Sequence, residues 1–218
     1  MKNLRNAALV SLLIGTNPAG FAQFQFANLN SKLTNSNFNS GCSVTIADWN
    51  NDGLDDIVIM DQSKNLNIAY QQSNGTFSVS SFGTVANGSQ WGMCIGDIDN
   101  DGHKDVLSGG YYDDVHIVNI DGPGAYAQSD YAWANIFAQG SNFADIDNDG
   151  WLDAFVCHDD GHSAILHNDG TGFMNNGASM MDLVFYPETN GNDNSGNYGT
   201  VWTDFDRDGD VEIGRAHV

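Results

Sequence analysis

A nine-residue acidic motif that occurs four times limits the folds open to this chain more than any other feature. The copies begin at Asp48, Asp97, Asp145 and Asp204, so their starts are 49, 48 and 59 residues apart. All four fit the pattern D-x-[DN]-x-D-G-x-x-[DE]. Sequence repeats with periods of about 20 to 50 residues are typical of solenoids and propellers, in which every repeat is one supersecondary unit. We therefore expect a row of similar units.

The acidic residues of the chain are concentrated in this motif. Seventeen of the 28 acidic residues lie in the four copies, and only 7 Lys and Arg oppose them, which gives a formal net charge of −21. Aspartate and the 25 glycines favour turns over helices. The charge argues against nucleic acid and anionic membranes as partners, because both are negatively charged. A hydrophobic content of 41% is too high for a disordered acidic tail.

The chemistry of the motif is that of a hard cation. Calcium binds six to eight oxygen atoms, and carboxylates at positions 1, 3, 5 and 9 can converge on one point while position 7 adds its backbone carbonyl. Glycine at position 6 permits the sharp turn that this wrapping requires. Without a cation, two carboxylates about 4 Å apart repel by about 4 kcal/mol at an effective dielectric constant near 20. Oxygen ligands disfavour zinc, and magnesium prefers stricter octahedral sites that keep water.

The motif is not an EF-hand, because that loop requires a bidentate Glu at position 12 and a helix on each side. Position 12 is Ile59, Ser108, Val156 or Arg215 in the four copies, so the loop must close on position 9. Short apolar runs flank the copies and predict strands. Position 2 is apolar in every copy and is expected to lie beneath the loop; its residues are Trp49, Ile98, Ile146 and Phe205.

Hairpin signals follow the loops, at Asn74-Gly75 and Asp169-Gly170, between further short apolar runs. A unit of about 50 residues with about four short strands has the size of one propeller blade. The four loops, together with Leu166-His167-Asn168-Asp169-Gly170-Thr171-Gly172-Phe173, resemble the FG-GAP/VCBS repeat family, whose calcium-loop propeller unit also occurs in integrin α-chain head domains. The segment 195–204 is similar to the secreted bacterial branch related to cartilage acidic protein.

The resemblance covers residues 40–212 and implies an all-β fold, a partial β-propeller with three four-stranded blades at about 40–88, 89–137 and 138–197 and an incomplete fourth at 198–212. It also implies one Ca²⁺ per loop, held by the side chains of positions 1, 3, 5 and 9 and the carbonyl of position 7. The implied ligands are Asp48, Asn50, Asp52, Leu54 and Asp56; Asp97, Asp99, Asp101, His103 and Asp105; Asp145, Asp147, Asp149, Trp151 and Asp153; and Asp204, Asp206, Asp208, Asp210 and Glu212. Asn50 removes a charge, so the first site is expected to be weaker.

The ends of the chain carry separate signals. Lys2 and Arg5, the apolar run 7–15 and Gly20-Phe21-Ala22 predict a signal peptide over residues 1–22 and a secreted or cell-surface protein. Residues 23–39 are expected to be a lead-in, with a strand over 24–33. The last six residues, 213–218, are what a common sequencing-adapter read would encode, and we expect them to be non-native. No apolar run is long enough for a membrane span.

Other chemistry is weaker in this sequence. Cys42, Cys94 and Cys157 lie far apart, and one disulfide with an odd thiol and three free thiols both remain open. The run 157–162, taken with His167, has the composition of a metal or acid–base site but fits a polar turn better. The leading interpretation is a non-catalytic, calcium-stabilised module that binds an extracellular protein or glycan. The alternatives are the propeller scaffold of a calcium-dependent polysaccharide-degrading enzyme, and an accessory part of a larger protein.

Overall fold

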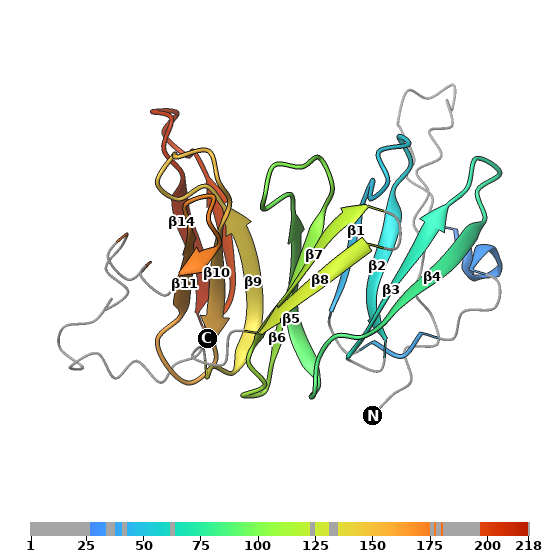
Figure 1. Cartoon of the computed structure of the whole chain (residues 1–218), viewed down its shortest axis with the longest axis horizontal. Coiled ribbons are helices and arrows are strands. Elements are labelled where there is room, and N and C mark those ends of the chain that lie inside the picture. The colour runs from blue at the N-terminus through green and yellow to red at the C-terminus, as the bar shows by residue number, and fades with distance from the viewer. Residues whose placement is uncertain are drawn as a thin grey trace, which may run out of the picture.

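The computed structural model describes residues 27–33, 38–40, 43–61, 64–122, 125–130, 135–174, 177, 180 and 197–217. The described part is built almost entirely from strands (Figure 1). The elements are η1 (Asn30–Lys32), β1 (Val44–Ala47), β2 (Asp56–Asp61), β3 (Asn65–Gln71), β4 (Phe77–Thr84), β5 (Gln90–Gly96), β6 (Asp105–Gly110), β7 (Val115–Gly122), β8 (Ala125–Asp130), β9 (Ala138–Ala144), β10 (Asp153–His158), β11 (Ala164–Asn168), β12 (Phe173–Met174), β13 (Asn197–Thr203) and β14 (Glu212–His217).

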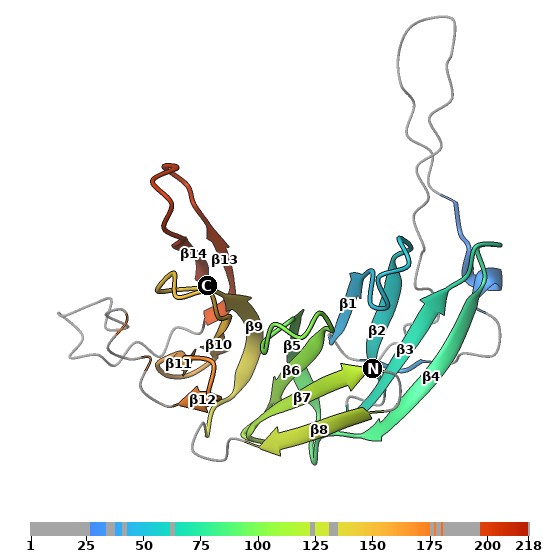
Figure 2. The ribbon, with the colours of Figure 1, turned by 45° about the horizontal axis from the view of Figure 1, so that its top comes forward.

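The strands form four separate antiparallel sheets in chain order. Three sheets have four strands each, in the orders β1-β2-β3-β4, β5-β6-β7-β8 and β12-β11-β10-β9, and the fourth contains β13 and β14. The first strands of successive sheets are neighbours, since β1 lies near β5, β5 near β9 and β9 near β13. Figure 2 shows the sheets side by side along an arc. This is the arrangement of propeller blades, and it confirms the all-β, partial-propeller prediction.

Apolar layers between neighbouring sheets hold the blades together. Between the first and second sheets, Val58 and Leu66 pack with Val106. Between the second and third sheets, Leu107 packs with Val156. Since successive side chains of a strand point to opposite faces, Val106 and Leu107 of the single strand β6 contribute to two different layers. The second strand of each full blade is therefore buried on both faces, which explains the continuous apolar runs of β2 and β10; in β6 the small residues Ser108, Gly109 and Gly110 follow Val106 and Leu107.

Two glycines allow the first strands of adjacent blades to approach closely. A Cβ atom at Gly92 in β5 would lie 3.0 Å from the carbonyl carbon of Gly140 in β9. A Cβ atom at Gly140 would lie 2.9 Å from the carbonyl oxygen of Tyr198 in β13. Any larger residue would push these strands apart, so the two glycines set the spacing of the inner strands.

The predictions for the lead-in and the tail have different outcomes. The strand expected over 24–33 is wrong for its described part, because Asn30–Lys32 form a single 3₁₀ turn; residues 24–26 lie outside the described residues, as does the predicted signal peptide. The tail predicted to be non-native forms β14, which pairs with β13. This pairing uses backbone groups that any sequence offers, so the origin of the tail stays a prediction. Within the described residues, no helix is long and apolar enough to cross a membrane.

Candidate metal loops and an aromatic surface

All four acidic motifs occupy the same structural position. Each motif lies between the first and second strands of its sheet, and the loops project from the same end of the blades, at the top of Figure 1. The flanking elements are strands, as predicted. The regular spacing of the motif in sequence thus becomes a row of loops along one edge of the molecule.

The residue at position 1 organises each loop from within. In the first loop, Asp48 Oδ1 accepts a hydrogen bond from the backbone N–H of Asp52 (3.0 Å), and Oδ2 accepts one from Gly53 (2.9 Å). The same pair of bonds forms at Asp97, Asp145 and Asp204. The position-5 carboxylate accepts from the N–H of position 7, whose residues are Leu54, His103, Trp151 and Asp210. These local bonds turn the carboxylates toward the inside of the loop.

Two positions of each loop have left-handed backbone conformations. Position 6 is always Gly, with φ between 85° and 103° in the four loops. Position 4 has φ between 58° and 65° and is Asn in three loops and Arg207 in the fourth. Glycine adopts positive φ without steric cost, and Asn tolerates it better than most other residues. The glycine of the motif is therefore required by the shape of the loop.

The position-9 carboxylates of the first three loops are buried and link the loop to the third strand of the blade. Asp105 Oδ2 accepts from the N–H of Ile98 (2.9 Å), and Oδ1 accepts from the N–H of Ile120 in β7 (2.8 Å). Asp56 and Asp153 make the equivalent bonds. Burial raises the pKa of Asp105 to about 7, against the effect of these two bonds, and the nearby Asp99 and Asp101 raise it further. Burial likewise raises the pKa of Asp56 and of Asp153.

Among the described residues, the fourth loop keeps the hydrogen bonds within the loop but has neither the burial of the others nor a bond from position 9 to a third strand. Glu212 Oε2 accepts from the N–H of Phe205 (2.6 Å), as the position-9 Asp does elsewhere. The side chain of Phe205 is 83% exposed, whereas Trp49 and Ile98 are buried and Ile146 packs against the next sheet. The expectation that position 2 lies beneath the loop is therefore wrong for Phe205, because no further described sheet packs against this loop.

Three of the predicted ligands lie close together in each of three loops. In each of the second, third and fourth loops, one oxygen from each of three carboxylates lies within 4.8 Å of the others. These sets are Asp97, Asp99 and Asp101; Asp145, Asp147 and Asp153; and Asp204, Asp206 and Glu212. In the first loop, Asn50 Nδ2 donates to Asp52 Oδ2 (3.1 Å) instead. A cluster of carboxylate oxygens suits Ca²⁺ or another hard cation, so the donor atoms fit the ion that the sequence predicts.

Hydrogen bonds between neighbouring loops were not predicted from the sequence. Asn51 Nδ2 donates to the carbonyl of Gly102 (3.1 Å), and Asn100 Nδ2 donates to the carbonyl of Gly150 (3.2 Å). Asn148 Nδ2 continues the series by donating to Asp210 Oδ1 (2.6 Å). The position-4 side chain of each of the first three loops thus contacts position 6 or 7 of the next loop. The recurrence of Asn at position 4 was the available sequence signal.

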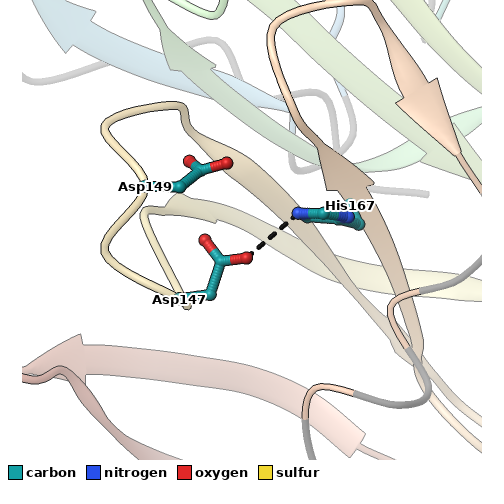
Figure 3. Close-up of side chains that lie close together, drawn as sticks. All are labelled: Asp147, Asp149 and His167. Atoms are coloured by element: carbon teal, nitrogen blue, oxygen red, sulfur yellow. Dashed lines mark ion pairs between the residues drawn. The ribbon is translucent and has the colours of Figure 1, made fainter.

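The histidines that the sequence placed together are separated in the structure. His158 ends β10, at the opposite end of the blade from the loops, and its Nδ1 lies 3.1 Å from Asp160 Oδ1. His167 lies in β11 beside the third loop, with Nε2 3.1 Å from Asp147 Oδ2 (Figure 3). The run after His158 forms the polar turn between β10 and β11, as the sequence favoured. The alternative of a site that joins this run to His167 does not form, because the hairpin carries His167 back toward the third acidic loop.

The described cysteines are free thiols. Cys157 is buried, and Cys94 is partly buried on β5. Burial raises the pKa of Cys94 to about 12 and that of Cys157 to about 11, so both thiols stay protonated at neutral pH. Cys42 lies outside the described residues.

An aromatic surface lies at the end of the blades opposite the metal loops, and we define it by Trp91, Tyr111, Tyr112 and Phe137. The ring centroids of Phe137 and Trp91 are 5.5 Å apart, and those of Phe137 and Tyr111 are 4.9 Å apart. The side chains of Trp91, Tyr111 and Tyr112 are 41%, 63% and 39% exposed. Tyr112 donates its hydroxyl to Asp160, which raises the pKa of Tyr112 to about 12.

Hydrogen bonds of Asp113 and His116 fix the turn that carries Tyr111 and Tyr112. Asp113 Oδ2 accepts hydrogen bonds from the N–H of Gly88 (2.6 Å) and from Gln90 Nε2 (2.9 Å). The buried His116 lies between Asp130 (2.7 Å) and Asp113 (3.2 Å). Exposed aromatic side chains on a rigid support are typical of binding surfaces, because they bury much area at little entropic cost.

Comparison with known families agrees with the architecture and the loops. The sequence model of the FG-GAP-like repeat matches the chain three times, at residues 48–108, 97–156 and 145–214. Each match begins at a motif aspartate and runs past the next motif, so the matches together cover most of the chain. The chain belongs to the FG-GAP-like repeat family. No curated protein matches it significantly over its sequence.

Proposed function

We propose that this chain is a secreted, calcium-stabilised β-propeller repeat module that binds an extracellular protein or glycan and does not itself catalyse a reaction. The observation that carries the proposal is the convergence of three carboxylates in three successive loops on one edge of the blades. The charge that these carboxylates bring together is destabilising unless a cation offsets it. A bound Ca²⁺ would link the first two strands of a blade through the loop and, through the position-9 aspartate, the third.

Thermal unfolding with and without calcium tests the role of the metal. An ion that binds only the folded state adds about 2.7 kcal/mol per site at one hundred times its Kd. We expect excess Ca²⁺ to raise Tm clearly over the value in EDTA, and Mg²⁺ to raise it less. The double variant Asp99→Asn/Asp101→Asn, which removes two negative charges from the second loop, should reduce the calcium-dependent rise in Tm. Equal Tm values in EDTA and in excess Ca²⁺ would contradict the proposal.

The aromatic surface supports the binding role. Trp and Tyr dominate the binding energy of many interfaces, and both Trp91 and Tyr111 are exposed here. We expect the double variant Trp91→Ala/Tyr111→Ala to keep the calcium-dependent Tm but to lose at least tenfold in affinity for any glycan or extracellular matrix protein that the wild-type chain binds on an array. Val201→Ala, at an exposed residue of the fourth sheet, is the matched control. Unchanged binding by the double variant would place the binding surface elsewhere.

Two further assays test secretion and the absence of catalysis. Expression of the full chain in a secreting host should yield an exported protein whose N-terminal sequence begins at Gln23. Incubation of that protein with acidic polysaccharides in the presence of Ca²⁺ should release no unsaturated or reducing ends. Turnover that is lost with the loop variants would favour the alternative of an enzyme scaffold.

A further inference from the structure

The third metal loop differs from the second at one neighbouring position in the third strand of the blade. Asn119 in β7 immediately precedes Ile120, the partner of Asp105, and its Nδ2 donates to Asp99 Oδ2 (2.8 Å). In the third blade the corresponding residue is His167 in β11, which immediately precedes Asn168, the partner of Asp153. This position faces loop position 3 in both blades. An amide therefore contacts the second loop, and an imidazole contacts the third.

The imidazole of His167 points into the third loop. Its Nε2 lies 3.1 Å from Asp147 Oδ2, and one ligand atom from each of His167, Asp147 and Asp149 lies within 4.8 Å of the others. Figure 3 shows the ring directed toward the two carboxylates. Nε2 is shielded from solvent, and among the described residues it has no hydrogen-bond partner beyond its close contact with Asp147. A buried ring nitrogen without a hydrogen bond, close to two carboxylates, is a ready metal ligand.

The distances suit direct coordination of one ion. First-row divalent ions bind imidazole nitrogen and carboxylate oxygen at about 2.0–2.2 Å. Two such ligands are about 3.0 Å apart at the right angles of an octahedral site and about 3.4 Å apart in a tetrahedral one. The observed separation of Nε2 and Asp147 Oδ2, 3.1 Å, is close to this value. Asp147 also belongs to a second group of three carboxylates, with Asp145 and Asp153, so further oxygen ligands lie in the same loop. A bound ion would lie between His167 Nε2 and Asp147 Oδ2 and form one coordination bond to each.

The chemistry of these ligands differs from that of the other loops. Calcium takes oxygen ligands, whereas imidazole favours first-row transition ions. We propose that the third loop is a site for a divalent first-row transition ion, with His167 Nε2 as a direct ligand beside Asp147 and Asp149, while the other loops remain all-oxygen calcium sites. The inference rests on the proposed function in one respect, namely that the loops bind cations.

The test adds one equivalent of Mn²⁺ to the EDTA-treated and dialysed full chain and measures nitrogen coupling by electron spin echo modulation. We expect a coupling typical of a coordinated imidazole in the wild-type chain and its loss in His167→Asn, the variant that gives the third loop the residue of the second. The affinity for Mn²⁺ and Co²⁺ at this site should fall at least tenfold in His167→Asn. The affinity for Ca²⁺ at the other loops should change less than threefold.

A reverse variant keeps the test informative whatever His167→Asn does to folding. In the double variant Asn119→His/His167→Asn, the imidazole coupling should return, now from the second loop. The proposal is overturned if Mn²⁺ bound to the wild-type chain shows no imidazole coupling. It is also overturned if His167→Asn binds Mn²⁺ and Co²⁺ as tightly as the wild type. In either case His167 is only an ion-pair partner of Asp147. If Ca²⁺ still raises Tm in that case, the proposed function stands and only this inference fails. If neither ion binds or raises Tm, both fail.

Discussion

Lowering the pH of the calcium-free protein from 8 to 6 should stabilise it through one buried carboxyl group, Asp105. Burial raises the pKa of Asp105 from 3.8 to about 7, which the N–H groups of Ile98 and Ile120 partly offset and the charges of Asp99 and Asp101 increase. Because the folded-state pKa lies above the unfolded-state value, the folded state binds the proton more tightly. The free energy of unfolding therefore rises as the pH falls through 7, and the full gain is reached below pH 3.8.

The size of the effect follows from the two pKa values. With an unfolded-state value of 3.8 and a folded-state value of about 7, proton linkage adds about 1.4 kcal/mol on going from pH 8 to pH 6 and about 2.7 kcal/mol by pH 5. The complete difference corresponds to about 4 kcal/mol. With a urea m-value of about 2 kcal/mol/M, the step from pH 8 to pH 6 moves the midpoint by about 0.7 M.

Urea unfolding in EDTA, followed by tryptophan fluorescence at pH 8 and pH 6, measures this shift. In Asp105→Asn, position 105 cannot titrate, whereas Asp56 and Asp153, whose pKa values are also raised, are unchanged. The difference in pH dependence between wild type and this variant therefore reports the contribution of Asp105 alone. In excess Ca²⁺ the dependence should reverse, because the ion requires the ionised carboxylate. An equal dependence on pH of wild type and Asp105→Asn in EDTA, or a smaller gain of the wild type at pH 6, would show that Asp105 does not take up the stabilising proton.

Three substitutions test the contacts between blades by urea unfolding in Ca²⁺. Asn100→Ala removes the hydrogen bond to the Gly150 carbonyl, which should cost about 0.5–1.5 kcal/mol, and places Ala at a φ of 58°, which adds to the loss. The number of bound calcium ions should not change, and an altered stoichiometry would mean that this bond shapes the sites themselves. Gly92→Ala places a Cβ 3.0 Å from the Gly140 backbone and should cost about 1–3 kcal/mol. Gly199→Ala is the control, because its Cβ would meet no atom within 4 Å, and it should cost much less. Equal costs of the two variants would contradict the close approach of β5 and β9. Leu107→Ala opens a cavity between the second and third blades and should cost about 2–5 kcal/mol, and a loss below 1 kcal/mol would show that the two blades are not packed on each other there.

The parts of the site that sequence reasoning predicted are those with local causes. The bonds from Asp48 reach only four and five residues along the chain, and the bond from Asp52 reaches two. Such contacts depend on residue type and turn geometry, which the motif states directly. The flanking strands were predictable for a similar reason, since β2 and β10 are buried on both faces and contain continuous apolar runs.

The parts that it missed depend on contacts between distant segments. The link from Asn100 to Gly150 joins residues 50 positions apart, and the pair of His167 with Asp147 requires the β10–β11 hairpin to reverse the chain. Phe205 is apolar, like the position-2 residues of the other three loops, but its exposure depends on which sheets pack against the fourth loop. Aligning the repeats by the position that precedes the partner of position 9 would have singled out Asn119 and His167.

The sequence by itself determined that this chain forms repeated strand–loop–strand units with clustered carboxylates, because the spacing of Asp and Gly within nine residues encodes both the turn and the ligand set. Only the tertiary structure decided which residues from other strands reach those loops, how each loop is linked to the next, and where exposed aromatic rings gather at the opposite end of the blades. These properties arise from the packing of sheets about 50 residues apart in the chain, and no local pattern specifies the distances across that packing.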